Sequence, residues 1–98
     1  MNMQQIMAQA QKMKKDIMNK QNEIEQMSFV GKSEWVEITF KGNKEPVKVD
    51  IINDAAFEKD NAEILSDMIL IAIKDGLKQI DKTTEQKLGA YAQMGGMF

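Results

Sequence analysis

The chain has 98 residues, of which 43% are hydrophobic, with a formal net charge of −2 and a pI of about 5.1. This length fits one domain with one modest core. The sequence contains no Cys, His or Arg, which excludes disulfides, a thiolate nucleophile and the commonest metal ligand. We therefore expect a single domain over residues 1–98 that is not an enzyme, with no cofactor, no metal site and no small-molecule substrate.

Residues 2–27 predict a long first helix. Apolar residues recur there with the alternating three- and four-residue spacing of a heptad seam, which only Lys20 interrupts, at Met3, Ile6, Ala10, Met13, Ile17, Ile24 and Met27. No Gly or Pro interrupts the run, so this helix would be about 38 Å long. A domain of this size has a radius of gyration of roughly 13 Å, so part of the helix must project.

Residues 28–52 predict two or three antiparallel strands. In "VEITFKGNKEPVKVDI" (36–51) the residues of one face are Val36, Ile38 and Phe40, then Val47, Val49 and Ile51. A turn with Gly42, Asn43 and Pro46 joins the two runs. The preceding "SFVGKSE" could add a first strand, with Gly31 as a bulge or bend. A two-stranded hairpin alone is marginal in water, so other elements must cover its apolar face.

A second helix is predicted from about residue 61 to residue 88. Asp60 and Glu63 have the spacing of a capping box at its start. Gly76 lies inside this helix, either because another backbone packs closely there or because it is merely tolerated. The apolar face consists of Ile64, Leu65, Met68, Ile69, Ala72, Ile73, Leu77 and Ile80. Residues 89–98, which are rich in glycine, are predicted to form a flexible tail.

This order of elements predicts an α+β fold, a two-layer α-β-β-β-α unit with a small antiparallel sheet and two long helices packed on one face. The apolar stripes of the helices are longer than such a sheet. A second copy of the chain would cover the excess, so we expect a two-fold homodimer. The residues assigned to its core or interface are Ile6, Met13, Ile17, Val36, Ile38, Phe40, Val47, Val49, Ile51, Ile69 and Ile73.

Over its whole length the chain resembles the YbaB/EbfC family of nucleoid-associated DNA-binding proteins. The stretches that carry the resemblance are "MQQIMAQAQKMKKDI", "VEITFKGNKEPVKVDI", "LSDMILIAIKDGLKQIDKTTEQKLG" and the tail "GGM". The resemblance implies a tight dimer whose helices project around duplex DNA like the arms of tweezers. The chain departs from the family pattern at "KSEW" and at "KDG", and no DNA-contacting position can be carried over residue by residue.

The charge is unevenly distributed along the chain. Residues 1–22 carry four lysines against one aspartate, whereas residues 54–67 carry five acidic residues against one lysine. We expect the lysines to contact phosphates weakly and with little sequence preference, because arginine, the usual reader of guanine, is missing. The candidates are Lys12, Lys14, Lys15, Lys20, Lys78, Lys82 and Lys87.

Other interpretations remain open. A helix, hairpin and helix with a coiled-coil seam also resembles prefoldin-like chaperone subunits, and a protein-binding adaptor would have a similar pattern. An enzyme is the least expected class, since the acidic segment 54–67 does not fit a calcium-binding loop and no glycine-rich phosphate loop is present. The longest apolar run, "MILIAI", is too short to cross a bilayer, so we expect a cytoplasmic, nucleoid-associated protein without membrane contact.

Overall fold

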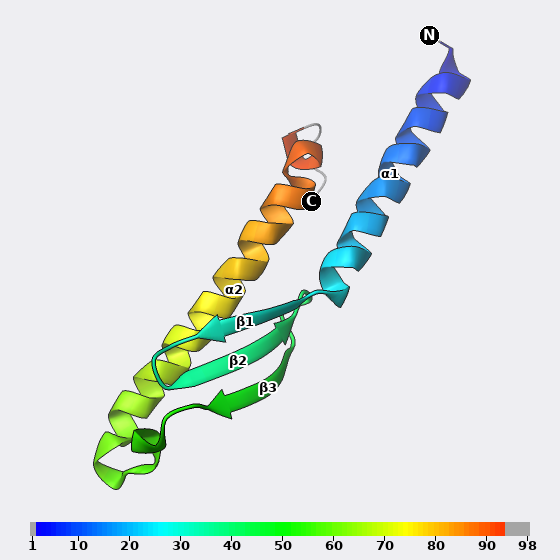
Figure 1. Cartoon of the computed structure of the whole chain (residues 1–98). Coiled ribbons are helices and arrows are strands. Elements are labelled where there is room, and N and C mark those ends of the chain that lie inside the picture. The colour runs from blue at the N-terminus through cyan, green and yellow to red at the C-terminus, as the bar shows by residue number, and fades with distance from the viewer. Residues whose placement is uncertain (1, 94–98) are drawn as a thin grey trace.

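The computed structural model describes residues 2–93. Its strands form one antiparallel sheet in the order β1-β2-β3, so the predicted α+β order of helix, three strands and helix is confirmed (Figure 1). The elements are α1 Met3–Gln26, β1 Ser28–Lys32, β2 Val36–Lys41, β3 Pro46–Ile51, the short 3-10 helices η1 Asp54–Phe57 and η2 Lys59–Asn61, and α2 Ala62–Gln93.

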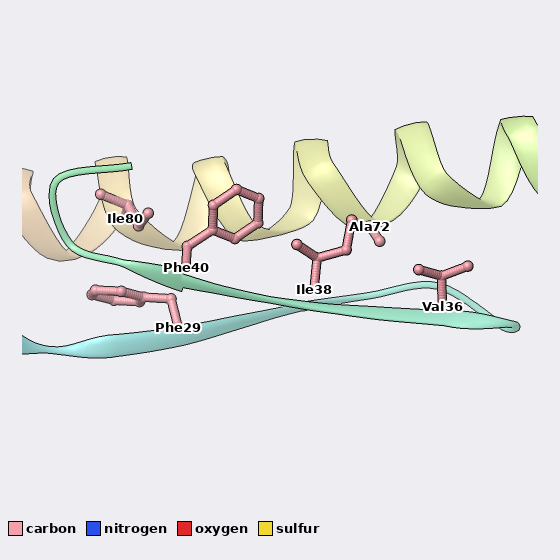
Figure 2. Close-up of a cluster of buried hydrophobic side chains, with 6 residues drawn as sticks. All are labelled: Phe29, Val36, Ile38, Phe40, Ala72 and Ile80. Carbon is pink, nitrogen blue, oxygen red and sulfur yellow. The ribbon is translucent and has the colours of Figure 1, made fainter. Parts of the chain in front are cut away.

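The main core lies between the sheet and α2. Val36, Ile38 and Phe40 alternate with more polar residues along β2 and point toward the helix, as predicted (Figure 2). Phe29 of β1 joins them from the sheet, and Ala72 and Ile80 close the cluster from α2. All six are at most 6% exposed.

Two glycines allow the helix to approach the sheet closely. Gly31 lies within regular β1, so the predicted bulge at this residue is wrong; the sheet's irregularity falls between Thr39 and Phe40. A Cβ atom on Gly31 would overlap the carbonyl oxygen of Ala72 and lie 2.6 Å from the amide nitrogen of Gly76. A Cβ atom on Gly76 would overlap the ring of Phe40, so Gly76 has the packing role that the sequence left open.

The ends of α2 differ from the prediction. The predicted capping box is not formed among the described residues: η2 runs directly into α2, and Asn61 instead donates from its side-chain amide to the carbonyl oxygen of Ala55, 2.8 Å away. At the other end α2 continues to Gln93, so residues 89–93, predicted as flexible tail, are helical. Residues 94–98 of that tail lie outside the described part.

Helix α1 projects from the body, as its length predicts. It does not lie on the sheet beside α2; it packs against the second half of α2 and extends beyond it (Figure 1). Ile17 and Ile24 of α1 enclose Leu88 of α2 in a second small core. The molecule is consequently elongated, with extents of 70 × 20 × 13 Å and a radius of gyration of 19.4 Å.

Strand β3 is poorly covered within one chain. Helix α2 packs mainly on β1 and β2. Val49 lies opposite the buried Ile38 and faces the same side of the sheet, yet it is 56% exposed, and Val47 is 50% exposed. Of the three β3 residues assigned to the inner face, Ile51 alone is partly buried against the main core.

Candidate nucleic-acid interface

The first half of α1 stands free of the rest of the described chain. Residues 2–12 are all exposed, and the first partly buried residue is Met13. The helix begins at a formed cap, in which the side-chain oxygen of Asn2 accepts a hydrogen bond from the Gln5 amide at 2.9 Å. A capped helix can extend into solvent as a rod, so its side chains are accessible from nearly every direction.

Three exposed lysines, Lys12, Lys14 and Lys15, lie at the end of this free part and in the turn that follows it, and we call residues 3–15 the arm. No acidic residue precedes Asp16, so residues 3–15 of α1 carry only positive side-chain charge. Lys20 lies lower on the helix and is partly buried beside the α1–α2 contact. The structure therefore brings three of the four α1 candidates together on the free arm and leaves Lys20 near its base.

The α2 candidates are less uniform. Lys78 and Lys82 are exposed and form a row with Lys74 at four-residue spacing on the outer face of the helix. Lys87 lies beside α1, with its ammonium nitrogen 3.8 Å from a carboxylate oxygen of Glu23. Lys87 thus contributes to the contact between the helices and is less available than Lys78 and Lys82.

Acidic residues gather at the opposite end of the molecule. Asp54, Glu58, Asp60, Glu63 and Asp67 lie in η1, in η2 and at the start of α2. That end is farthest from the N-terminus of α1, as Figure 1 shows. The chain therefore carries a basic cluster on the projecting part of α1 and an acidic cluster at the opposite end of the molecule, although its net charge is only −2.

The hairpin lysines are partly neutralised by neighbours. Lys44 in the β2–β3 turn lies 3.2 Å from Asp81 of α2, and Lys48 of β3 lies 3.6 Å from Asp50. These pairs are well exposed and add little stability. They do reduce the local positive charge of the sheet, whereas the three lysines of the α1 arm have no acidic partner among the ion pairs of the described chain.

Sites for other chemistry are lacking in residues 2–93. Two hollows are open and polar in part: one lies between Gln21, Gly42 and Asp81, the other along the lower end of α1 near Asn22 and Met27. No group of three acidic side chains is arranged to hold a metal ion within the described range. Among the same residues, no helix combines the length and apolar character needed to span a bilayer.

Sequence reasoning missed the residues that hold the arm and the sheet edge. Leu88 was not assigned to the apolar face of the second helix, although it continues the register of Ile80 after eight residues. Asp75 and Gln79 bond to the edge of β1, which no local pattern indicates because the partners are more than forty residues away.

The chain is similar to known proteins over nearly its whole length. The sequence profile of the "YbaB/EbfC DNA-binding family" matches residues 1–97. Two proteins of Streptococcus pneumoniae, from strains CGSP14 and JJA and each named "Nucleoid-associated protein", are 47% identical to it over 94 residues, which is 94% of either chain.

A solved structure has the same fold. The crystal structure of an uncharacterized protein from Helicobacter pylori aligns with a TM-score of 0.71, covering 97% of this chain and 99% of that one at 23% identity. The family profile names DNA binding and no catalysed reaction, in agreement with the expectation of a protein that is not an enzyme. From the extent of the profile match and the identity to its relatives, the chain belongs to the YbaB/EbfC DNA-binding family.

Proposed function

We propose that this protein is a nucleoid-associated homodimer that binds duplex DNA through lysines on its projecting helices, with little sequence preference. The observation that carries the proposal is the arm of α1, residues 3–15, where Lys12, Lys14 and Lys15 are exposed and no acidic residue is present. The names of the Streptococcus relatives support nucleoid association.

The physical basis of binding is release of counterions from the duplex. A lysine placed near a phosphate displaces a condensed cation, so affinity falls steeply as the salt concentration rises. The acidic residues lie at the end of the molecule opposite the arm (Figure 1). This separation reduces repulsion between their carboxylates and the phosphates of DNA bound at the arm. A dimer doubles the number of arm lysines from three to six, which suits a duplex that presents phosphates on both strands.

Weak sequence preference follows from the residue types on the arm. Lysine contributes a flexible point charge, whereas arginine makes the bidentate contact to guanine and enters narrow minor grooves. The arm also carries Gln4, Gln5, Gln9 and Gln11. Glutamine can bond to adenine edges, but an exposed glutamine on a helix more commonly serves solvation, so these residues are assigned no reading role.

Dimerisation is supported by an apolar surface that one chain leaves uncovered. Val47 and Val49 are exposed on the α2 side of the sheet. Leu70, 53% exposed, lies on the α2 flank that faces β3, because it precedes Asp81 by three helical turns and Asp81 reaches Lys44 in the β2–β3 turn. A second chain placed along β3 would bury this apolar surface in both copies.

The decisive experiment is a titration of random duplex DNA at several salt concentrations, followed by fluorescence anisotropy. Four to six lysines in contact with phosphates give a slope of log affinity against log salt of roughly −4 to −5. Replacing Lys12, Lys14 and Lys15 together by Gln should remove most of this slope and weaken binding equally on unrelated sequences.

A matched control replaces three exposed lysines away from the arm, Lys32, Lys48 and Lys59, by Gln. It changes the net charge equally and should leave most of the affinity intact. Loss of binding in the control, with retention in the arm variant, would mean that DNA lies across the sheet. No binding at low salt would favour a protein partner, and a preference for an unfolded client would favour the chaperone interpretation.

A further inference from the structure

A three-stranded sheet has two edges, and here the edges differ. An edge strand points the N–H and C=O groups of every second residue away from its neighbour, where another strand can pair with them. Natural proteins protect such edges, because unpaired backbone groups attract other chains. In this sheet the edge strands are β1 and β3.

Two outward groups of β1, one N–H and one C=O, are already bonded. Ser33 donates its amide hydrogen to the Val36 carbonyl at the hairpin end, so its backbone groups face β2. By the alternation along the strand, the backbone groups of Lys32 and Val30, one and three residues earlier, turn outward. The Lys32 amide donates to a carboxylate oxygen of Asp75 at 2.8 Å. The carbonyl oxygen of Val30 accepts from the side-chain amide of Gln79, also at 2.8 Å.

Asp75 and Gln79 act as one unit, which we call the edge cap. They lie one turn apart on α2, and the Gln79 amide nitrogen also lies 3.0 Å from the Asp75 carboxylate. The cap reaches the strand because Gly31, between Val30 and Lys32, has no side chain to hold the helix away. The two bonds from the cap to β1 span more than forty residues of sequence, so they form only when α2 is docked.

The outer edge of β3 has no such protection in the described chain. Ile52 donates its amide hydrogen to the Trp35 carbonyl at 2.8 Å, so by the same alternation Val49 and Ile51 turn their backbone groups outward. Within residues 2–93, no side chain hydrogen-bonds to those groups. The same strand exposes Val47 and Val49, so an open edge and an open apolar face coincide there.

We infer that the edge cap of Asp75 and Gln79 closes β1 to strand addition, so that the sheets of two chains join only through β3 and the assembly stops at a closed pair. This inference rests on the homodimer proposed above. With both edges open, β1 of one chain could pair with β3 of the next. Such a head-to-tail contact does not close on itself and adds chains without limit.

The test removes the cap from the full-length protein by Asp75→Ala with Gln79→Ala. The Lys32 amide should then exchange its hydrogen at least about tenfold faster, because exchange follows local opening of the bonded group. Light scattering should give masses above twice 11.1 kDa that rise with concentration. The matched control, Asp67→Ala with Gln86→Ala, also removes one carboxylate and one amide from exposed positions of α2 and should stay dimeric.

A third variant identifies the edge that is used. Lys32→Pro, added to the cap-deficient protein, deletes the outward N–H of β1, and proline is accepted where an edge N–H faces solvent. It should restore the dimer mass. Three results would overturn the inference: unchanged hydrogen exchange at the Lys32 amide, a cap-deficient protein that keeps the dimer mass, or an assembly mass that still rises with concentration in the Lys32→Pro variant. If the wild-type protein has the mass of a monomer and the cap-deficient protein still forms larger assemblies, the proposed homodimer is wrong, whereas the protective role of the edge cap stands.

Discussion

At Gly31 the sheet and α2 are in close contact, and this contact requires a residue without a side chain. The sequence alone does not reveal that requirement. The sequence presents Gly31 in a short strand, where a bulge is the usual explanation. The actual cause is the helix backbone, with Ala72 and Gly76 in contact across the strand. Gly76 is likewise unusual inside a helix, and its cause is the ring of Phe40, which occupies the space that a Cβ atom would need. A local pattern identifies an unusual glycine, whereas its partner depends on tertiary packing.

The glycine contacts predict that alanine destabilises the fold at both positions. Gly31→Ala should destabilise the fold by about 1–3 kcal/mol or more, because the backbone of α2 must move. Gly76→Ala should also destabilise it, since displacement of Phe40 outweighs the gain of about 1 kcal/mol in helix propensity. Urea denaturation measures both as lower midpoints.

Gly89→Ala is the control for these two variants. Gly89 lies in the same helix as Gly76, and a Cβ atom there meets nothing within 4 Å. This variant should keep the midpoint or raise it, in line with the better helix propensity of alanine. A loss of stability at Gly89 equal to that at Gly76 would assign the effect to the helix and not to packing on Phe40.

At the scale of elements, the helices and strands follow from periodicity, whereas their ends and mutual contacts do not. The heptad seam of α1 predicts a helix without revealing that only its lower half, at Ile17 and Ile24, is covered. The covering residue, Leu88, lies near the predicted end of α2, which in fact continues to Gln93. Helix ends depend on few interactions, so they are the weakest part of a sequence-based prediction.

Leu88 predicts a way to loosen the arm without changing its charge. Leu88→Ala removes the side chain between Ile17 and Ile24, and a buried Leu→Ala change typically costs about 2–5 kcal/mol of local packing. Amide hydrogens in the lower half of α1 should exchange faster, while those of β2 stay protected. DNA affinity should fall with an unchanged salt slope, because the number of lysines is the same.

Met18→Ala is the control for the arm, since Met18 is on the same helix and 53% exposed. It should leave both exchange and DNA affinity as in the wild type. If Leu88→Ala reduces the salt slope in proportion to affinity, the arm loses phosphate contacts and is not merely loosened. If neither quantity changes, Leu88 does not position α1.

At the scale of the whole molecule, the apolar residues exceed what one chain buries. The sequence predicts one continuous inner face for the hairpin, and the register agrees, because Ile38 and Val49 are direct partners on the same side. Their burial nevertheless differs, at 3% and 56% exposed. Alternation along a strand assigns a face but cannot tell which part of that face a helix covers and which part another chain would cover.

This pair of residues separates folding from assembly. Ile38→Asp places a carboxylate in the main core without a partner, a change that costs several kcal/mol, and the protein should lose its cooperative unfolding transition. Val49→Asp places the same carboxylate directly opposite, on a surface that is open within one chain. It should leave the circular dichroism spectrum of the fold intact while light scattering falls from about twice 11.1 kDa to the mass of one chain. DNA affinity of this monomer should drop and its salt slope should halve, since three arm lysines remain of six. A Val49→Asp protein that stays dimeric places the interface away from β3, and an Ile38→Asp protein that stays folded contradicts the assignment of the core.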